Sequence, residues 1–395
     1  MTNQAKQMNV PIARTSLTQA EIQSVLEPLR SGWLVQGPKV REFEEKWSAF
    51  VGAKHAIATT SCTTALHLSL AALGFLPGDE AIVPSFTWIA TANVIEHLGG
   101  SVVFCDIDPV TFNLDVEQLE RVVTKRTKAI LPVHLFGLAA DMDRVLEFAR
   151  SRGLWVVEDA ACGFGSLYKN RHVGAFGDAG CFSFHPRKAI TTGEGGMITT
   201  DSDALAERLR RLRDHGAAMS DLQRHLGARP YLLADHPDAG YNQRMTDIQG
   251  ALGSAQMNRA DAIVAERRRL AKRYDEAFDD LSWLRLPARP VDSVHGYQSY
   301  SCMFEPEAIT PQSVTHVNAL RNEFMDRLQK AGISTRPGTH AVHMLDFYKR
   351  KYGLHPEDYP NARAANDCSI SLPLFHGMTN KEQDHVVGAI RSEKF

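Results

Sequence analysis

Short apolar runs alternate with longer segments of helical periodicity from about residue 52 to residue 200. This alternation is typical of βαβ units, in which helices join parallel strands. Most of the apolar runs contain no polar position, so we expect a mostly parallel sheet that is covered on both faces. Seven strands are predicted: His55–Thr59, Glu80–Pro84, Ser101–Cys105, Ala129–Val133, Leu154–Glu158, Cys181–Ser183 and Gly196–Thr200.

Helical patterns separate these strands and continue after them. A charge-rich helical stretch, Ile248–Leu281, leads into a region that mixes a strand-like segment, Ser299–Phe304, with further helices. We therefore expect an N-terminal arm (residues 1–25), a large α/β domain (26–255) and a small α+β domain (256–395). The other predicted helices are Thr64–Leu73, Trp88–Leu98, Val116–Val123, Met142–Arg152, Ala204–His215, Ser313–Ala331, Asn361–Cys368 and Asn380–Glu393.

Composition excludes several classes of protein. With 395 residues, 44% of them hydrophobic, the chain can bury more than one core, which argues against intrinsic disorder. Lysine and arginine number 44 against 46 acidic residues, a net charge of −2, and no basic stripe appears. A nucleic-acid partner is therefore not expected, because nothing would neutralise a phosphate backbone.

The cysteines and the N-terminal sequence bear on compartment. The six cysteines are scattered without the spacing of a zinc site or a disulfide framework, so we expect a reducing compartment and no metal. The first fifteen residues lack the apolar core of a secretory signal, and no apolar stretch suits a bilayer span. A cytoplasmic protein without membrane attachment is predicted.

One lysine stands in unusual surroundings. Lys188 follows the predicted strand Cys181–Ser183 and precedes a glycine-rich turn that ends at Gly196. A lysine amine reacts with an aldehyde only when it is deprotonated, which requires a partly desolvated site. Taken alone, such a lysine is more often a surface side chain than a catalyst.

An acid upstream changes that balance. Asp159 follows the apolar run Leu154–Glu158, at the end of a buried parallel strand, where α/β folds bind ligands. A lone aspartate there usually caps a turn. Together, however, Lys188 and Asp159 supply what pyridoxal phosphate needs, an amine for its aldehyde and a carboxylate that keeps its ring nitrogen protonated.

Other residues suit the rest of this cofactor. The strand-to-helix turn after Thr59 offers hydroxyl groups and helix N–H groups to a phosphate, and Ser183 could add another hydroxyl. Trp88, at the start of a predicted helix, could stack on the pyridine ring. The ordinary alternatives are N-capping by serine or threonine and a core aromatic side chain.

With these motifs in this order, the chain resembles the DegT/StrS-type sugar aminotransferases, a branch of the fold type I pyridoxal phosphate enzymes related to aspartate aminotransferase. The resemblance covers nearly the whole length and implies that fold, with a mixed, mostly parallel seven-stranded sheet. Four further motifs join the segments above: Ser31–Pro38, Leu131–Gly137, Gly240–Gln249 and Ile370–Leu374.

The resemblance implies roles for individual residues. Lys188 would bind the cofactor covalently and then carry the proton between cofactor and substrate, passing through the pyridoxamine 5'-phosphate form. Asp159 would bind the ring nitrogen and Trp88 the ring face. His185 would lie near the sugar. The phosphate would be bound by Thr63, by Ser183, by backbone amides at Cys62 and Thr63, and by Asn242 of the neighbouring subunit, so the site would be completed in a homodimer.

Two cysteines depart from the family pattern. Cys62 stands where the family usually has glycine, and Cys162 where it has glutamine or histidine beside the cofactor's phenolic oxygen. A thiol offers a weaker hydrogen bond there than an amide or imidazole, which affects the electronic tuning of the cofactor.

The implied activity moves the amino group of L-glutamate to a keto sugar. A nucleotide-linked 4-keto-6-deoxyhexose is our first prediction, as in perosamine synthesis for lipopolysaccharide O-antigen. A free keto sugar acid such as a keto-octulosonate is the alternative, because Arg336 suits a pyrophosphate and a carboxylate equally. His340 and His343 are further candidate sugar contacts, or ordinary surface residues. A sugar dehydratase is disfavoured because such relatives replace the lysine with histidine, and a non-catalytic regulatory homologue because the cofactor residues are intact.

Overall fold

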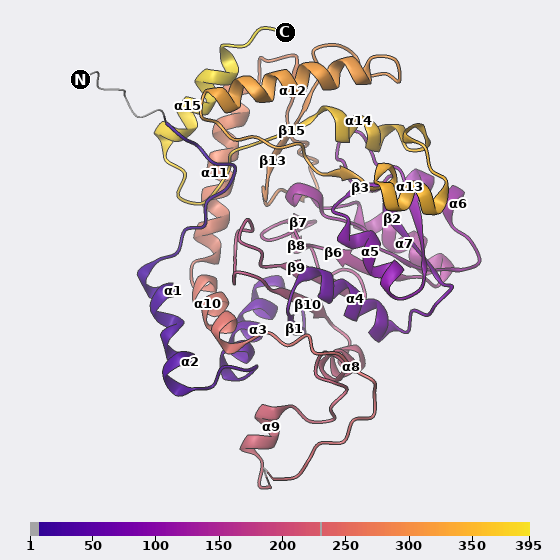
Figure 1. The fold of residues 1–395 in the computed structure, drawn as a ribbon, viewed down its shortest axis with the longest axis vertical. Coiled ribbons are helices and arrows are strands. Elements are labelled where there is room, and N and C mark those ends of the chain that lie inside the picture. Colours follow the sequence, from indigo (N-terminus) through magenta and orange to yellow (C-terminus); the bar gives the residue numbers. More distant parts are fainter. Residues whose placement is uncertain (1–7, 230) are drawn as a thin grey trace.

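The computed structural model describes residues 8–229 and 231–395; the first seven residues of the expected N-terminal arm lie outside them. Seven strands form the central sheet in the order β1-β10-β9-β6-β5-β2-β4 (Figure 1). Only β10 runs against its neighbours, so the predicted mostly parallel sheet is confirmed. The bounds are β1 His55–Thr59, β2 Glu80–Pro84, β4 Ser101–Cys105, β5 Thr127–Ile130, β6 Trp155–Asp159, β9 Ala179–Ser183 and β10 Gly196–Thr200.

Helices cover both faces of the sheet because successive strand residues point to opposite sides. On β6, Val156 packs into one core and Val157 into the other. The Val157 core is closed by α4 Cys62–Leu73, α5 Ala90–His97, α8 Asp203–Arg213 and α13 Asp346–Tyr352. The Val156 core is closed by α3 Pro38–Val51, α6 Leu119–Val122, α7 Met142–Arg152 and α10 Asp247–Met257.

A third core lies in the C-terminal part of the chain. Helix α11, Ala260–Phe278, connects it to the sheet, since Ile263 packs into the Val156 core and Leu270 into the C-terminal core. The small antiparallel sheet β11-β13-β15 forms the centre of this region. Its elements are β11 Leu284–Arg285, β13 Tyr300–Phe304, β15 Ser369–Leu372, α12 Val314–Lys330, α14 Pro360–Cys368 and α15 Asn380–Arg391.

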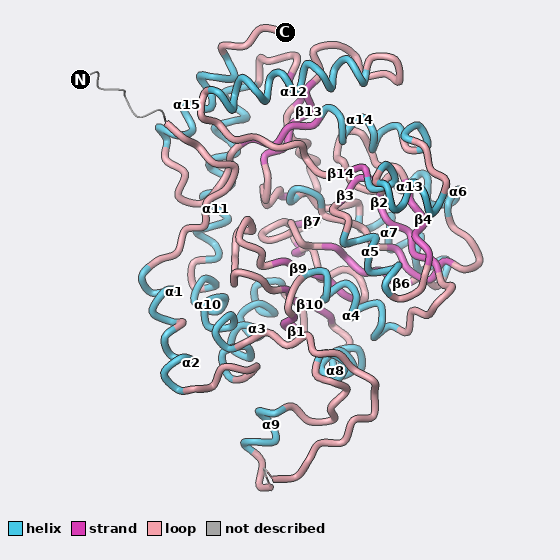
Figure 2. Tube along the Cα trace, in the orientation of Figure 1, coloured by secondary structure: helices cyan, strands magenta, loops and turns pink. Residues whose placement is uncertain are grey.

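Short elements and long loops connect these layers (Figure 2). Helix α9, Asp221–Leu226, belongs to a segment that projects from the body of the molecule (Figure 1). The remaining elements are α1 Gln19–Ser24, α2 Leu26–Ser31, β3 Phe86–Thr87, β7 Leu167–Tyr168, β8 Arg171–His172, β12 Ser293–Val294, β14 His340–Ala341, and the 3-10 turns η1 Val116–Gln118, η2 Leu135–Gly137, η3 Val342–Met344 and η4 Pro356–Asp358.

The structure corrects one long helix. The predicted Ile248–Leu281 is two helices, α10 and α11, with a break at Asn258 and Arg259. Arg259 leaves helical geometry (φ −123°, ψ 21°), and its guanidinium binds the Glu21 carboxylate and the Ser16 carbonyl. Within residues 8–229 and 231–395, no helix is both long and apolar enough to cross a membrane.

Candidate active site

The carboxyl ends of the parallel strands gather the predicted site residues. Asp159, the last residue of β6, is buried, and its two oxygens accept from different donors. Thr91 Oγ1 donates to Oδ2 at 2.7 Å, and the Ala161 N–H donates to Oδ1 at 3.1 Å. A carboxylate can accept about four hydrogen bonds, so Asp159 retains capacity for a ligand.

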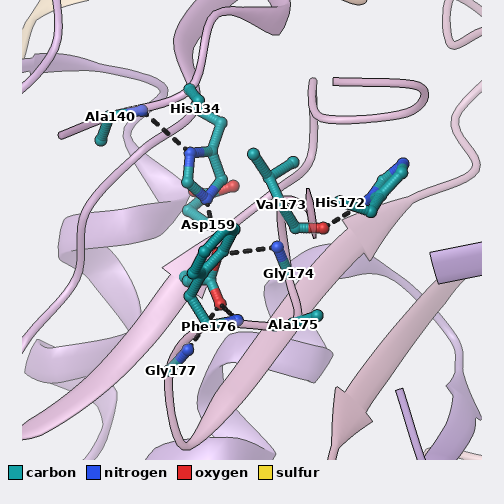
Figure 3. A network of polar contacts seen from close by, with 12 residues as sticks. His134, Ala140, Asp159, His172, Val173, Gly174, Ala175, Phe176 and Gly177 are labelled. Carbon is teal, nitrogen blue, oxygen red and sulfur yellow. Dashed lines mark hydrogen bonds and ion pairs between the residues drawn. The ribbon is translucent and has the colours of Figure 1, made fainter. Parts of the chain in front are cut away.

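The neighbouring carboxylate, Glu158, is fully engaged inside the protein. The backbone N–H groups of Gly174, Phe176 and Gly177 each donate to it at 2.7 Å. A fourth contact comes from His134, whose Nε2 lies 2.9 Å from Glu158 Oε2 (Figure 3). Burial alone would raise the pKa of Glu158, but the hydrogen bonds from His134 and the backbone outweigh burial and lower it.

The tautomer of His134 follows from its second contact. The Ala140 N–H donates to His134 Nδ1 at 3.1 Å, so Nδ1 carries no proton and Nε2 donates to Glu158 (Figure 3). The His134 N–H also donates to the Asp159 carbonyl at 3.0 Å. This network fixes the end of β6 and thereby the backbone of Asp159.

Lys188 lies in the turn that follows β9. Its backbone N–H donates to the His185 carbonyl at 2.8 Å, and its half-buried Nζ lies 3.2 Å from Cys162 Sγ. Among the described residues, Nζ forms no ion pair with a carboxylate. The polar side-chain contact of the amine within the described residues is therefore the one with Cys162, and no carboxylate there competes for it.

The start of α4 forms a site for an anion. Ser61 and Thr64 form a capping box, so their N–H groups are satisfied by each other's hydroxyls. The N–H groups of Cys62 and Thr63 make no bond within the described chain and lie at the positive end of the helix dipole. Strand β10 begins against this turn at Gly196, where a Cβ would stand 2.3 Å from the Ser61 carbonyl oxygen.

An exposed aromatic pair lies beside this region. Trp88 is 56% exposed, and its ring centroid is 5.6 Å from that of His340, at an interplanar angle of 40°. The pair forms because β3 and β14 are hydrogen-bonded with Thr87 opposite His340. A predicted ring-stacking residue and a predicted sugar contact therefore meet, although 252 positions separate Trp88 from His340 in the sequence.

The two cysteines that depart from the family pattern have different surroundings. Cys62 is buried and donates to the Cys181 carbonyl at 3.4 Å. Burial, together with the nearby Asp159, raises the pKa of the Cys62 thiol well above its ordinary value, so that thiol is unreactive. Cys162 is half-buried and contacts the Lys188 amine, which places it on the reactive side of the site.

The other predicted site residues are placed as follows. Ser183 Oγ accepts from the His185 N–H at 3.4 Å, and partial burial lowers the pKa of His185. Arg336 is exposed, with Nη1 on the Thr335 carbonyl. Asn242 is exposed, its backbone bridged to Asp214.

His343 is not brought to the site surface. Its side chain is fully buried, Nε2 lies 3.3 Å from the Pro356 carbonyl, and its ring lies 4.8 Å from that of Tyr359. Burial lowers the pKa of His343. In this conformation, the residue can act on a ligand only through its neighbours.

Sequence reasoning missed two residues in the site. Thr91 donates to Asp159, and the available signal was its place near the start of the predicted helix Trp88–Leu98, which follows a predicted strand. Gln298 binds the turn that carries Lys188, and no local pattern marks it, because its partners are more than a hundred residues away.

These residues fit pyridoxal phosphate. A half-buried amine, a buried carboxylate with free acceptor capacity, an exposed indole and an unpaired helix N-terminus are the four features that the cofactor requires. The amine, the carboxylate and the helix N-terminus follow or end β9, β6 and β1 of the central sheet, whereas the indole follows β3, which pairs with β14 in a separate two-stranded sheet. Lys188, Asp159, Trp88 and the Cys62–Thr63 turn would hold the cofactor.

Comparison with known proteins agrees with this assignment. The model of the DegT/DnrJ/EryC1/StrS aminotransferase family matches residues 15–391. The spore coat polysaccharide biosynthesis protein SpsC of Bacillus subtilis is 40% identical over 97% of this chain and 96% of its own length. GDP-perosamine synthase of Caulobacter vibrioides is 38% identical over 96% of this chain and 97% of its own.

Solved structures give the same result. Spr1654 of Streptococcus pneumoniae, named as a sugar aminotransferase and solved in PMP and PLP forms, superimposes with a TM-score of 0.88. For the PMP form, the identity is 30%, over 97% of this chain and 98% of that one. The chain belongs to the DegT/DnrJ/EryC1/StrS aminotransferase family. The predicted class, a pyridoxal-phosphate-dependent sugar aminotransferase, is confirmed.

Proposed function

We propose that this enzyme transfers the amino group of L-glutamate to a nucleotide-linked 4-keto-6-deoxyhexose, giving a perosamine-type amino sugar for a surface polysaccharide such as lipopolysaccharide O-antigen. The observation that carries the proposal is the placement of the Lys188 amine beside Cys162 at the sheet edge that also holds Asp159. The choice of acceptor is supported by the 38% identity to GDP-perosamine synthase over nearly the whole chain.

Each residue has a defined task in this proposal. Pyridoxal phosphate, when bound, supplies an aldehyde that accepts the amine and a ring that takes up negative charge. Lys188 Nζ would bind that aldehyde and would carry the proton between the reacting carbons. Asp159 would stabilise a positive charge on the ring nitrogen, and Thr91 and the Ala161 N–H keep the carboxylate oriented.

The phosphate is held at the positive start of α4. The N–H groups of Cys62 and Thr63, with the hydroxyls of Thr63 and Ser183, are the donors. Cys162 lies beside the Lys188 amine and would contact the phenolic oxygen of the cofactor.

The sugar is bound at the exposed side of the site. Trp88, which pairs with His340, would cover the ring of the cofactor, and His340, His185 and Arg336 would contact the acceptor. We give His343 an indirect role because it is buried. A guanidinium binds a pyrophosphate through paired hydrogen bonds, which suits a nucleotide-linked sugar. A free keto sugar acid would use the same arginine through its carboxylate.

We further propose a homodimer in which Asn242 completes the partner's phosphate site. Asn242 is exposed, and it follows the projecting segment that contains α9 (Figure 1). This segment exposes Leu226, Tyr231 and Leu233, with Leu233 92% accessible. Such apolar side chains are usually covered by a partner surface, and a second copy of this chain is the partner we propose. The compartment we propose is the cytoplasm, in keeping with six free cysteines.

Half-reaction spectroscopy tests the donor and the acceptor. Glutamate added to the enzyme carrying its cofactor should convert the absorbance of the PLP form to that of the PMP form. Nucleotide-linked 4-keto-6-deoxyhexoses should then restore the first spectrum. No change with glutamate would overturn the donor, and recovery only with a free carboxylated keto sugar would overturn the nucleotide-linked acceptor.

A further inference from the structure

The side chain of Gln298 binds the chain on both sides of Lys188. Its Oε1 accepts from the Ala189 N–H at 3.2 Å, and its Nε2 donates to the Arg187 carbonyl at 2.8 Å. The reverse orientation of the amide would place donor against donor and acceptor against acceptor, so the chemistry fixes which atom is which. One planar group thus holds both peptide groups that flank the lysine.

The backbone that presents Gln298 has an unusual conformation. Tyr297 lies in the left-handed region with φ +48°, which is unfavourable for a residue with a side chain. It is held there by its own N–H, which donates to His295 Nδ1 at 2.8 Å, and by Arg267 Nε, which donates to its carbonyl at 2.9 Å. Such a conformation persists only where the surroundings enforce it.

The side chain of Arg267 binds the loop of residues 295–299, which contains Gln298. Arg267 is 3% exposed, and its guanidinium donates to three carbonyl oxygens, those of Tyr297, Gln298 and Leu374. No carboxylate pairs with it among the described residues, and burial lowers the pKa of Arg267 to about 10. A charge buried without an acid partner is costly, and here the three carbonyl oxygens are what offsets that cost. Arg267 therefore favours the loop conformation that turns these carbonyl groups toward it.

The same loop is also hydrogen-bonded to the Leu131–Gly137 motif, which precedes β6 in the sequence. The Gly296 N–H donates to the Gly137 carbonyl at 2.8 Å, and the Ser299 N–H donates to the Phe136 carbonyl at 3.2 Å. Gly137 has φ +100°, and a Cβ there would stand 2.8 Å from the Tyr297 nitrogen. The contact therefore requires glycine, and it joins the C-terminal region to the sheet edge that carries the site.

We propose that Gln298 is a positioning residue that fixes the Lys188 turn and so keeps the lysine amine in its reactive place. The proposal rests on the function assigned above to Lys188. Arg187 and Pro186 are exposed, so solvent can compete for the turn's peptide groups once the amide is removed. The distortion at Tyr297 is then the means by which the fold directs Gln298 toward this turn.

Hydrogen exchange of the cofactor-loaded enzyme tests the contact without measuring activity. Gln298→Met removes both hydrogen bonds at similar size, and Gln298→Glu keeps an acceptor for the Ala189 N–H but loses the donor to Arg187. We expect exchange at Ala189 to be about tenfold faster in the methionine variant and close to wild type in the glutamate variant. Gln329→Met, at an exposed position of α12, is the matched control. Unchanged exchange at Ala189 in Gln298→Met would overturn the proposal.

Turnover supplies the second readout. In Gln298→Met we expect kcat to fall about tenfold with KM nearly unchanged, because the lysine is misplaced while the sugar contacts are intact. A rise in KM alone would contradict a positioning role. If Lys188→Ala retained turnover, the function assigned to Lys188 would fail. The exchange result would still report on the contact of Gln298 with the Lys188 turn, so the two failures are distinguishable.

Discussion

The two faces of strand β6 end in carboxylates that do different work. Glu158 faces the α3 and α7 side and receives four hydrogen bonds from protein groups, whereas Asp159 faces the other side and receives two. Both are almost fully buried, at 0% and 4% exposure. A carboxylate satisfied by the protein holds the fold together, and one left partly unsatisfied can bind a ligand. Burial alone does not distinguish them.

Asp159→Asn should give the largest loss of activity. The amide keeps the size of the side chain but removes the charge that we propose to face the cofactor ring, so turnover should fall by about a hundredfold to a thousandfold. Thermal unfolding should shift little. Steady-state kinetics would measure the effect, with Asp178→Asn as the control; Asp178 precedes β9 and accepts from the Val156 N–H near the start of β6. Near-normal turnover in Asp159→Asn would remove the distinction between the two faces.

Glu158→Gln should instead affect stability first. An amide placed among three N–H donors leaves at least one of them unpaired and removes a buried charge on which the network depends. We expect the free energy of unfolding to fall by about 3 kcal/mol. Denaturant titration would measure it, with the exposed Glu147→Gln as a control that should stay within about 0.5 kcal/mol of wild type. An unfolding midpoint equal to that of the control would mean that Glu158 does not stabilise the fold.

Thr91→Val tests how much the orientation of the Asp159 carboxylate contributes to turnover. The change keeps the shape of the side chain and removes its donor to Asp159 Oδ2. Because Asp159 then loses one of its two orienting bonds, we expect turnover to fall about tenfold. The exposed Thr315→Val on α12 serves as the control. A loss as large as that of Asp159→Asn would show that Thr91 does more than orient the carboxylate.

Acid should reduce the advantage of Glu158 over glutamine. The pKa of Glu158 is lowered in the folded state from its ordinary value of 4.5. Its stabilising contribution is therefore complete above the unfolded pKa and is lost as the pH falls through the folded pKa. The difference in unfolding free energy between wild type and Glu158→Gln should shrink from pH 7 to pH 4. A difference that grew in acid would reverse the sign of this argument.

The sheet could be predicted from sequence because its strands are apolar runs with clear ends. Strands β1, β2, β4 and β10 match their predicted bounds, and β6 is displaced by one residue, which brings Asp159 into the strand. The pairing of β3 with β14 could not be predicted, because each has two residues and their partners are distant in sequence. The break before α11 depends on the contact of Arg259 with Glu21, which no local pattern contains.

The residues of the candidate site also fall into those that the sequence could predict and those that it could not. Asp159 ends β6, Trp88 directly follows β3, and Lys188 lies in the turn after β9, so their places at strand ends could be inferred from topology. The roles of Glu158, His134 and Gln298 depend on hydrogen bonds between distant segments, and the burial of His343 depends on its packing against Tyr359. Sequence motifs therefore marked the groups that we propose to face the ligand, whereas the groups that hold them in place became visible only in the structure.

The central claim is that the Lys188 amine is the group that binds the cofactor covalently. Borohydride reduction of the loaded enzyme, followed by peptide mapping, tests it most directly. The account predicts that the reduced cofactor is found on the peptide containing Lys188 and is absent from that position in Lys188→Ala. Finding it on another lysine, or finding no covalent adduct in the loaded wild-type enzyme, would contradict the account.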